Sequence, residues 1–140
     1  MSKIDILYPV LAHVLLVVLL YIPLVIRKAQ AVKSKAVDLK VTALNNQAWT
    51  EDVIKVSNNI ANQFETPILF YVLCIIAVLT STVDMLGVVL AWSYVALRYI
   101  HSYIHTHSNY VPYRMRVFAL SLLILLIMLI NTVVQLVNLT

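Results

Sequence analysis

The chain has 140 residues, of which 62% are hydrophobic and 11% are charged, with a formal net charge of +4. So few charged residues cannot cover the surface of a soluble domain, and the composition therefore indicates a protein whose outer surface faces lipid. Nucleic-acid binding is a poor explanation of the basic charge, because the basic residues lie at membrane edges, where topology accounts for them. We expect an integral membrane protein.

The first apolar segment, residues 6–26, is long enough to cross the hydrocarbon core as a helix, which takes about 20 residues. No small-residue cleavage pattern follows it, so we expect a retained helix rather than a signal sequence. His13 lies alone in this segment, which is typical of a packed or capped histidine. Pro23 is expected to bend or end the helix, because proline removes a backbone hydrogen bond.

A polar connection follows, and we expect part of it to be helical and to lie along the membrane surface, with Trp49 as an anchor at the interface. The second segment, residues 53–80, contains an apolar run that is too short to cross alone. Its helix must therefore extend back through three polar residues, namely Asn58, Asn62 and Glu65.

A short turn separates this segment from the third, residues 85–105, so the two should be antiparallel neighbours. The fourth segment, residues 116–137, is apolar apart from a few polar side chains. The expected fold is a single domain over residues 1–140, an all-α membrane protein built as a four-transmembrane-helix bundle. Cys74 is the only cysteine, which excludes a disulfide within one chain and a zinc site made of cysteines.

Charge predicts the orientation of these spans. The basic residues outside the segments fall almost entirely in or near the first and third loops, whereas the opposite side carries only Lys3. The positive-inside rule then places both loops in the cytoplasm and both termini on the other side.

Two sets of polar residues predict one site near the cytoplasmic ends. Asn58, Asn62 and Glu65 stand at i, i+4 and i+7 of the second span. The third span carries a similar stripe, namely Tyr94, Arg98, His101 and His105. An ionisable residue at membrane depth costs about 2.5–3.5 kcal/mol on insertion scales, so such groups usually have a function. The alternative is structural: Glu65 and Arg98 could form an ion pair that joins two helices, and the asparagines could bond between helices.

The histidines allow a further hypothesis. His101 and His105, one helical turn apart, could bind a metal or haem, with His107 as a third ligand. Histidines near a membrane interface are more often hydrogen bonders, and we therefore expect no metal.

These motifs together resemble the MAPEG family, the membrane-associated proteins of eicosanoid and glutathione metabolism. The resemblance rests on Asn62-x-x-Glu65, on the run from Arg98 to Arg116 and on the four-span layout, and it covers nearly the whole chain. It implies a homotrimer that binds glutathione as co-substrate in a cleft between neighbouring subunits, open toward the cytoplasm.

The resemblance also implies roles for individual residues. Arg114 matches the arginine that stabilises the glutathione thiolate, with Arg116 as a second candidate. The tripeptide would contact further residues, namely Asn58, Asn62, Glu65, Arg98, His101 and His105. The family commonly has an arginine where this chain has Asn58 and a tyrosine where it has His105. An uncharacterised bacterial-type branch is the nearest description.

The function implied is a membrane-bound glutathione-dependent transferase or peroxidase that acts on lipophilic electrophiles. Its partners would be membrane lipids, a lipophilic small-molecule substrate and further copies of the chain. The alternative is a protein of the same fold that is not an enzyme and binds lipid or a protein partner, with the polar cluster holding the subunits together.

Overall fold

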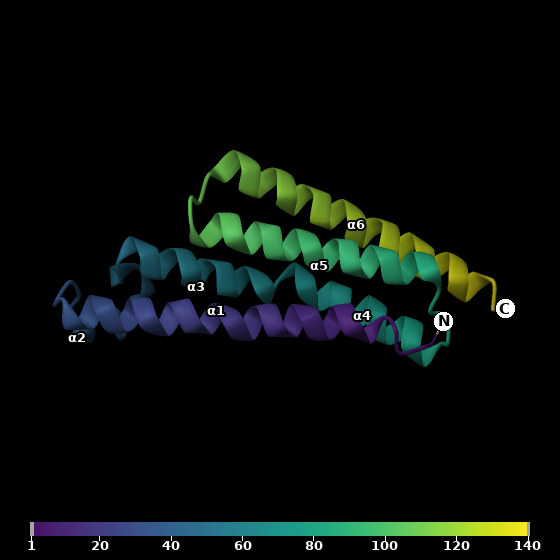
Figure 1. Ribbon diagram of the computed structural model, residues 1–140, viewed down its shortest axis with the longest axis horizontal. Coiled ribbons are helices and arrows are strands. Elements are labelled where there is room, and N and C mark those ends of the chain that lie inside the picture. Colours follow the sequence, from purple (N-terminus) through teal and green to yellow (C-terminus); the bar gives the residue numbers. More distant parts are fainter. Residues whose placement is uncertain (1, 140) are drawn as a thin grey trace.

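The computed structural model describes residues 2–139, and its elements in that range are helices joined by turns. The long helices are α1 (Leu7–Lys33), α5 (Met85–Thr106) and α6 (Val111–Val137) (Figure 1). Between α1 and α5 lie the two halves of a broken helix, α3 (Glu51–Gln63) and α4 (Thr66–Leu79). The connection after α1 contains a short helix α2 (Leu39–Thr42) and a 3-10 turn η1 (Asn46–Ala48). Met1 and Thr140, the ends of the expected domain, lie outside the described residues.

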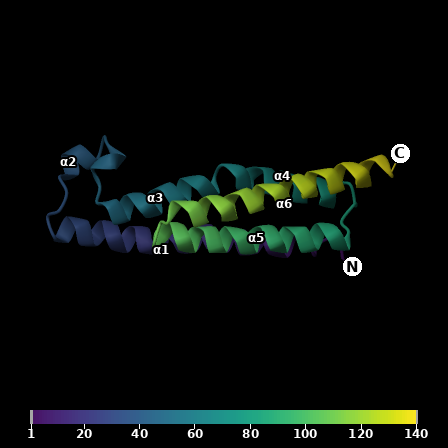
Figure 2. The same ribbon diagram turned by 90° about the horizontal axis from the view of Figure 1, so that it is seen from above.

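The long helices run side by side along one axis, with both chain termini at the same end of the molecule (Figures 1 and 2). α5 contacts α1, α3 and α6, and α4 contacts α1, α3 and α6. The short turn between α4 and α5 makes them antiparallel, as the sequence predicts. α2 lies at the end opposite the termini.

The outer surface is apolar along most of the length of the long helices. Leucine, valine and isoleucine side chains such as Leu11, Val25 and Val133 are half or more exposed. Three helical segments of the described chain are long and apolar enough to cross a membrane: α1, α3 together with α4, and α6. An apolar surface of this extent is stable only in contact with lipid or a partner.

The first helix continues farther than the sequence predicts. α1 passes through Pro23 and ends at Lys33 rather than near residue 26. The added turns are held by Arg27, whose Nη1 donates to the carbonyl of Asp52 at 2.9 Å and whose Nη2 donates to the carbonyl of Thr106 at 3.2 Å. These bonds tie the end of α1 to α3 and α5, so tertiary contacts extend a helix that its apolar pattern alone would end.

The second segment is not the continuous helix that the sequence predicts. α3 ends at Gln63, and α4 begins at Thr66 with Glu65 in a non-helical conformation (φ −98°, ψ −100°). Pro67 explains the break, because it has no N–H to donate and its ring would clash with the carbonyl of Gln63. Glu65 therefore does not share a helical face with Asn58 and Asn62, and that part of the prediction is wrong.

Candidate functional site

A buried polar network lies where α3 breaks, and Gln63 is at its centre. The Arg98 side chain is completely buried, and its Nε and Nη2 donate to Oε1 of Gln63 at 3.2 and 2.9 Å. Nη2 also donates to the carbonyl of Asn62 at 3.1 Å, a group near the end of α3 that the break deprives of its helical partner. The guanidinium of α5 therefore caps the last turn of α3.

The same network fixes the tautomer of the neutral His13 ring. Arginine only donates, so the atom of Gln63 that faces Arg98 must be its carbonyl oxygen. Nε2 of His13 lies 3.2 Å from this oxygen and must therefore carry a hydrogen. In the neutral ring Nδ1 is then an acceptor, and the hydroxyl of Tyr71 donates to it at 2.6 Å. His13 is thus a buried, hydrogen-bonded histidine, as the sequence predicts.

The amide nitrogen of Gln63 faces the other way. It donates to Oδ1 of Asn59 at 3.0 Å and to the hydroxyl of Ser102 at 3.1 Å, and Ser102 in turn donates to Asn59 at 3.3 Å. Side chains of α1, α3, α4 and α5 thus meet in one network. Because an unpaired polar group in a low-dielectric interior is costly, such a network fixes the relative position of these helices.

A second polar site opens beside this network. Asn62, His101 and Arg114, with Met115 and Phe118, line a pocket of about 150 Å³ among α3, α5 and α6. The Arg114 guanidinium is half-buried, and its Nη1 donates to Oδ1 of Asn109 at 2.6 Å. The side chain therefore has a fixed position at the start of α6, next to the pocket.

The two histidines of α5 flank this arginine. Nε2 of His105 lies 3.3 Å from Nη1 of Arg114 and must accept, because arginine only donates. The His101 and His105 rings are 5.7 Å apart, edge to face. Both histidines are buried, yet neither ring nitrogen of His101 makes a well-formed hydrogen bond to another described residue. His101 thus places an imidazole ring in the pocket wall.

The remaining expected site residues, Asn58, Glu65 and Arg116, do not line this pocket. Asn58 and Glu65 are exposed, and the carbonyl of Asn58 accepts from the side chain of Asn62 at 2.8 Å. Arg116 is exposed and lies over the Tyr113 ring at 5.8 Å, so it does not line the pocket.

The ion pair considered between Glu65 and Arg98 is not formed. Among the described residues the salt bridge present is between Lys55 and Glu51, at 2.9 Å. Arg98 has a neutral amide and a carbonyl as its partners instead. Nor does the described part of the chain contain a group of three or more histidine, cysteine, aspartate or glutamate side chains that could hold a metal ion.

Comparison with protein families decides the relationship. The model of the MAPEG family matches residues 6–134. The chain belongs to the MAPEG family. The match includes α1, α5, most of α6 and every expected site residue, and with the apolar surface it establishes an integral membrane protein. No curated protein and no solved structure matches the chain.

The sequence reading of this MAPEG chain missed Gln63 and its partners. α3 carries two adjacent polar stripes, one with Asn58 and Asn62 and the other with Asn59 and Gln63. Both pairs have i, i+4 spacing, and periodicity cannot tell which one faces the protein interior. Ser102 is a sequence signal for this network, because it lies four residues after Arg98 and therefore on the same face of α5.

Proposed function

We propose that this chain is a membrane-bound, glutathione-dependent transferase or peroxidase that acts on lipophilic electrophiles. Membership of the MAPEG family supports glutathione as co-substrate. The observation that carries the proposal is the pocket in which Asn62, His101 and Arg114 meet. It combines a fixed cation with neutral hydrogen-bonding groups beside an apolar, lipid-facing surface.

The proposed role of Arg114 is to activate the thiol. A free thiol has a pKa of about 8.5, and a nearby guanidinium lowers this value and favours the nucleophilic thiolate. Both hydrogen bonds that the Arg114 side chain makes to described residues use Nη1, which leaves Nε and Nη2 for a ligand. In a transfer reaction the thiolate sulfur would bond to the electrophilic carbon, whose leaving group departs with the bonding electrons.

The other pocket residues would hold the tripeptide. Asn62 and His101 line the pocket. His105 accepts a hydrogen bond from Nη1 of Arg114 and so helps to hold that side chain in place. Arg98 is fully buried in its own network, so we assign it a positioning role through the carbonyl of Asn62 rather than direct contact with glutathione.

A homotrimer would complete the site. Asn58 and Glu65 are exposed on the single chain, and Arg116 points away from the pocket, so these residues could contact glutathione only across a subunit interface. In this proposal α5 also spans the membrane, as the third of four spans in chain order, and the α1–α3 and α5–α6 connections lie in the cytoplasm with both termini outside. The basic residues at that end support this orientation.

The test is calorimetric titration of glutathione into the detergent-solubilised protein. We expect Arg114→Ala to weaken binding at least tenfold, which corresponds to about 1.4 kcal/mol. Arg114→Lys should bind glutathione more weakly than the native protein but more tightly than Arg114→Ala, because lysine keeps the charge but loses the planar guanidinium fork. Lys55→Gln is the matched control, since it removes a positive charge at the same end of the bundle, where Lys55 pairs with Glu51. Full glutathione binding and thiol-dependent turnover in Arg114→Ala would refute the assignment.

The alternative is a non-enzymatic MAPEG protein that binds lipid or a protein partner. Two observations favour it: Asn58 replaces the arginine common in glutathione-using members, and Arg98 is committed to an internal network. In that case substitutions in the cluster should disrupt assembly. A Glu65→Gln protein that assembles normally but has lost glutathione binding would contradict this alternative.

A further inference from the structure

The net charge of the protein is concentrated in one segment. Residues 27–40 contain five basic residues and a single acid, Asp38, and so account for the whole net charge of +4. The rest of the chain is balanced, with five basic and five acidic residues. Such a segment attracts anions, whereas the remainder of the surface has no net preference.

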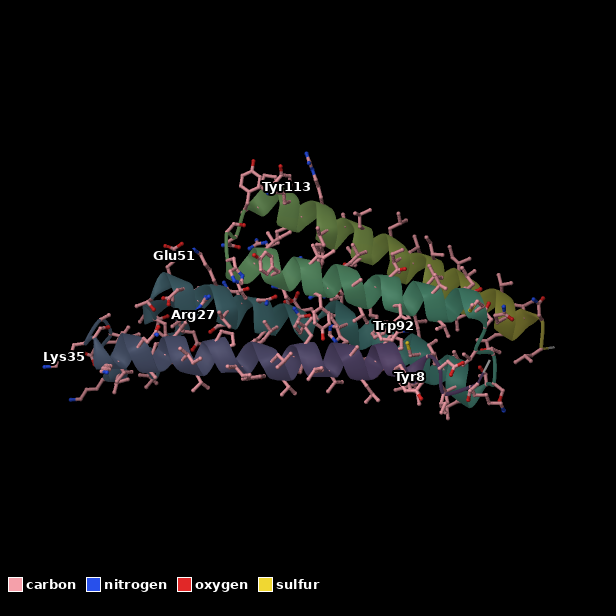
Figure 3. All side chains as sticks on the ribbon, in the orientation of Figure 1. Tyr8, Arg27, Lys35, Glu51, Trp92 and Tyr113 are labelled. Carbon is pink, nitrogen blue, oxygen red and sulfur yellow. The ribbon has the colours of Figure 1, made fainter. Side chains whose placement is uncertain are left out.

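The charges of this segment are free to meet a partner. Lys33, Lys35 and Lys40 are exposed, and Lys35 points away from the bundle at the end of α1 (Figure 3). No salt bridge involves them among the described residues. Arg27 and Lys28 differ, because Arg27 is bonded to two backbone carbonyls and Lys28 lies 4.7 Å from the centre of the Trp49 ring. The three outer lysines therefore form the accessible set.

Apolar side chains stand beside these lysines. Leu39 and Val41 on α2 are 55% and 50% exposed, and Leu44, just after it, is 94% exposed. Figure 2 shows α2 displaced to one side of the α1 end, rather than packed between the long helices. Large apolar side chains alternating with lysines are the composition of a segment that lies in the membrane interface, where apolar groups enter the lipid and ammonium groups meet phosphates.

The backbone at Lys35 favours glycine rather than a residue with a long side chain. Lys35 has a left-handed conformation (φ 56°) after the C-terminus of α1, and the N–H of Ala36 closes the turn onto the carbonyl of Ala31 at 3.0 Å. This position usually holds glycine, because other residues adopt the left-handed region at a cost. The chain therefore keeps a lysine where glycine would fit better.

We propose that residues 33–44 form a docking surface for anionic phospholipid headgroups, in which Lys33, Lys35 and Lys40 contact the phosphates and Leu39, Val41 and Leu44 enter the interface. The occupant is the lipid bilayer surrounding the protein, and charge complementarity selects its anionic component. This surface lies on the end of α1, on α2 and on its flanking turns, away from the pocket of Arg114. It does not depend on the function proposed for that pocket.

The experiment compares hydrogen exchange of residues 34–45 in the full-length protein, reconstituted in nanodiscs of phosphatidylcholine alone or mixed with phosphatidylglycerol. We expect slower exchange with phosphatidylglycerol and a return to the faster rate at high salt, because salt screens such contacts. A lysine near an anionic surface contributes about fivefold to binding, so three lysines should give a large difference between the two discs. Residues 107–111 in the α5–α6 loop are an internal control and should exchange equally in both.

Two triple variants separate charge from fold. Lys33→Gln, Lys35→Gly and Lys40→Gln together should remove the difference between discs, and the glycine relieves the strain at position 35, so instability cannot explain the loss. Replacement of the same three lysines by arginine should keep the difference. Equal exchange of the native protein in both discs, or a lipid effect that survives in the uncharged variant, would overturn the proposal and leave the lysines with a role in topology alone.

Discussion

Replacing Gln63 by alanine should destabilise the protein severely, since one side chain satisfies several buried groups. Oε1 of Gln63 accepts from Nε and Nη2 of Arg98 and from Nε2 of His13. After the substitution Nη2 still has the carbonyl of Asn62, but Nε of Arg98 and Nε2 of His13 have no other partner. A buried donor left unpaired costs about 1–3 kcal/mol, and more when it is charged. We therefore expect the free energy of unfolding to fall by about 2–6 kcal/mol, the summed cost of these two unpaired donors.

The measurement is unfolding by sodium dodecyl sulfate in mixed micelles, followed by far-ultraviolet circular dichroism. Gln63→Glu should lose less stability than Gln63→Ala, because its carboxylate can accept from both Arg98 and His13, although the bonds to Asn59 and Ser102 are lost. Gln30→Ala is the matched control, an exposed glutamine on α1 whose loss should change stability by less than about 0.5 kcal/mol. If Gln63→Ala and this control unfold within about 1 kcal/mol of each other, the network does not hold the helices together.

Three further outcomes are expected. Asp84→Ala should lower the free energy of unfolding in the same assay by about 2–4 kcal/mol. The carboxylate caps α5 at the N–H of Gly87 and accepts hydrogen bonds from the side chains of Asn131 and Gln135 of α6, and the substitution removes all of these bonds. An unchanged unfolding transition would contradict this. Gly87→Ala should cost about 1–3 kcal/mol, since the new Cβ would lie 2.8 Å from Oδ1 of Asp84, and a neutral result would mean that the carboxylate has room to move. In glutathione titrations Arg116→Ala should weaken binding less than Arg114→Ala, and the reverse order would transfer the thiol-activating role to Arg116.

The interior of the bundle could be predicted only in part. The spacing on α5 predicts one polar face, and in the structure Arg98, His101 and His105 are all buried. Their partners were not foreseen, because a helical stripe shows which residues share a face but not what that face meets. Arg98 was expected to meet an acid or a ligand, yet it meets an amide oxygen and a carbonyl. That carbonyl is available only because α3 breaks.

The sequence by itself determined the class of this protein, the family and the approximate position of its apolar helices, since these depend on composition, run length and a few spaced motifs. Tertiary structure decided where the helices end and which polar groups meet. Arg27 extends α1 by bonding to other helices, and Pro67 breaks the second segment so that Glu65 leaves the face of Asn62. The physical reason is that hydrogen bonds between distant segments can outweigh local conformational preferences, and the local sequence does not show which distant groups will meet.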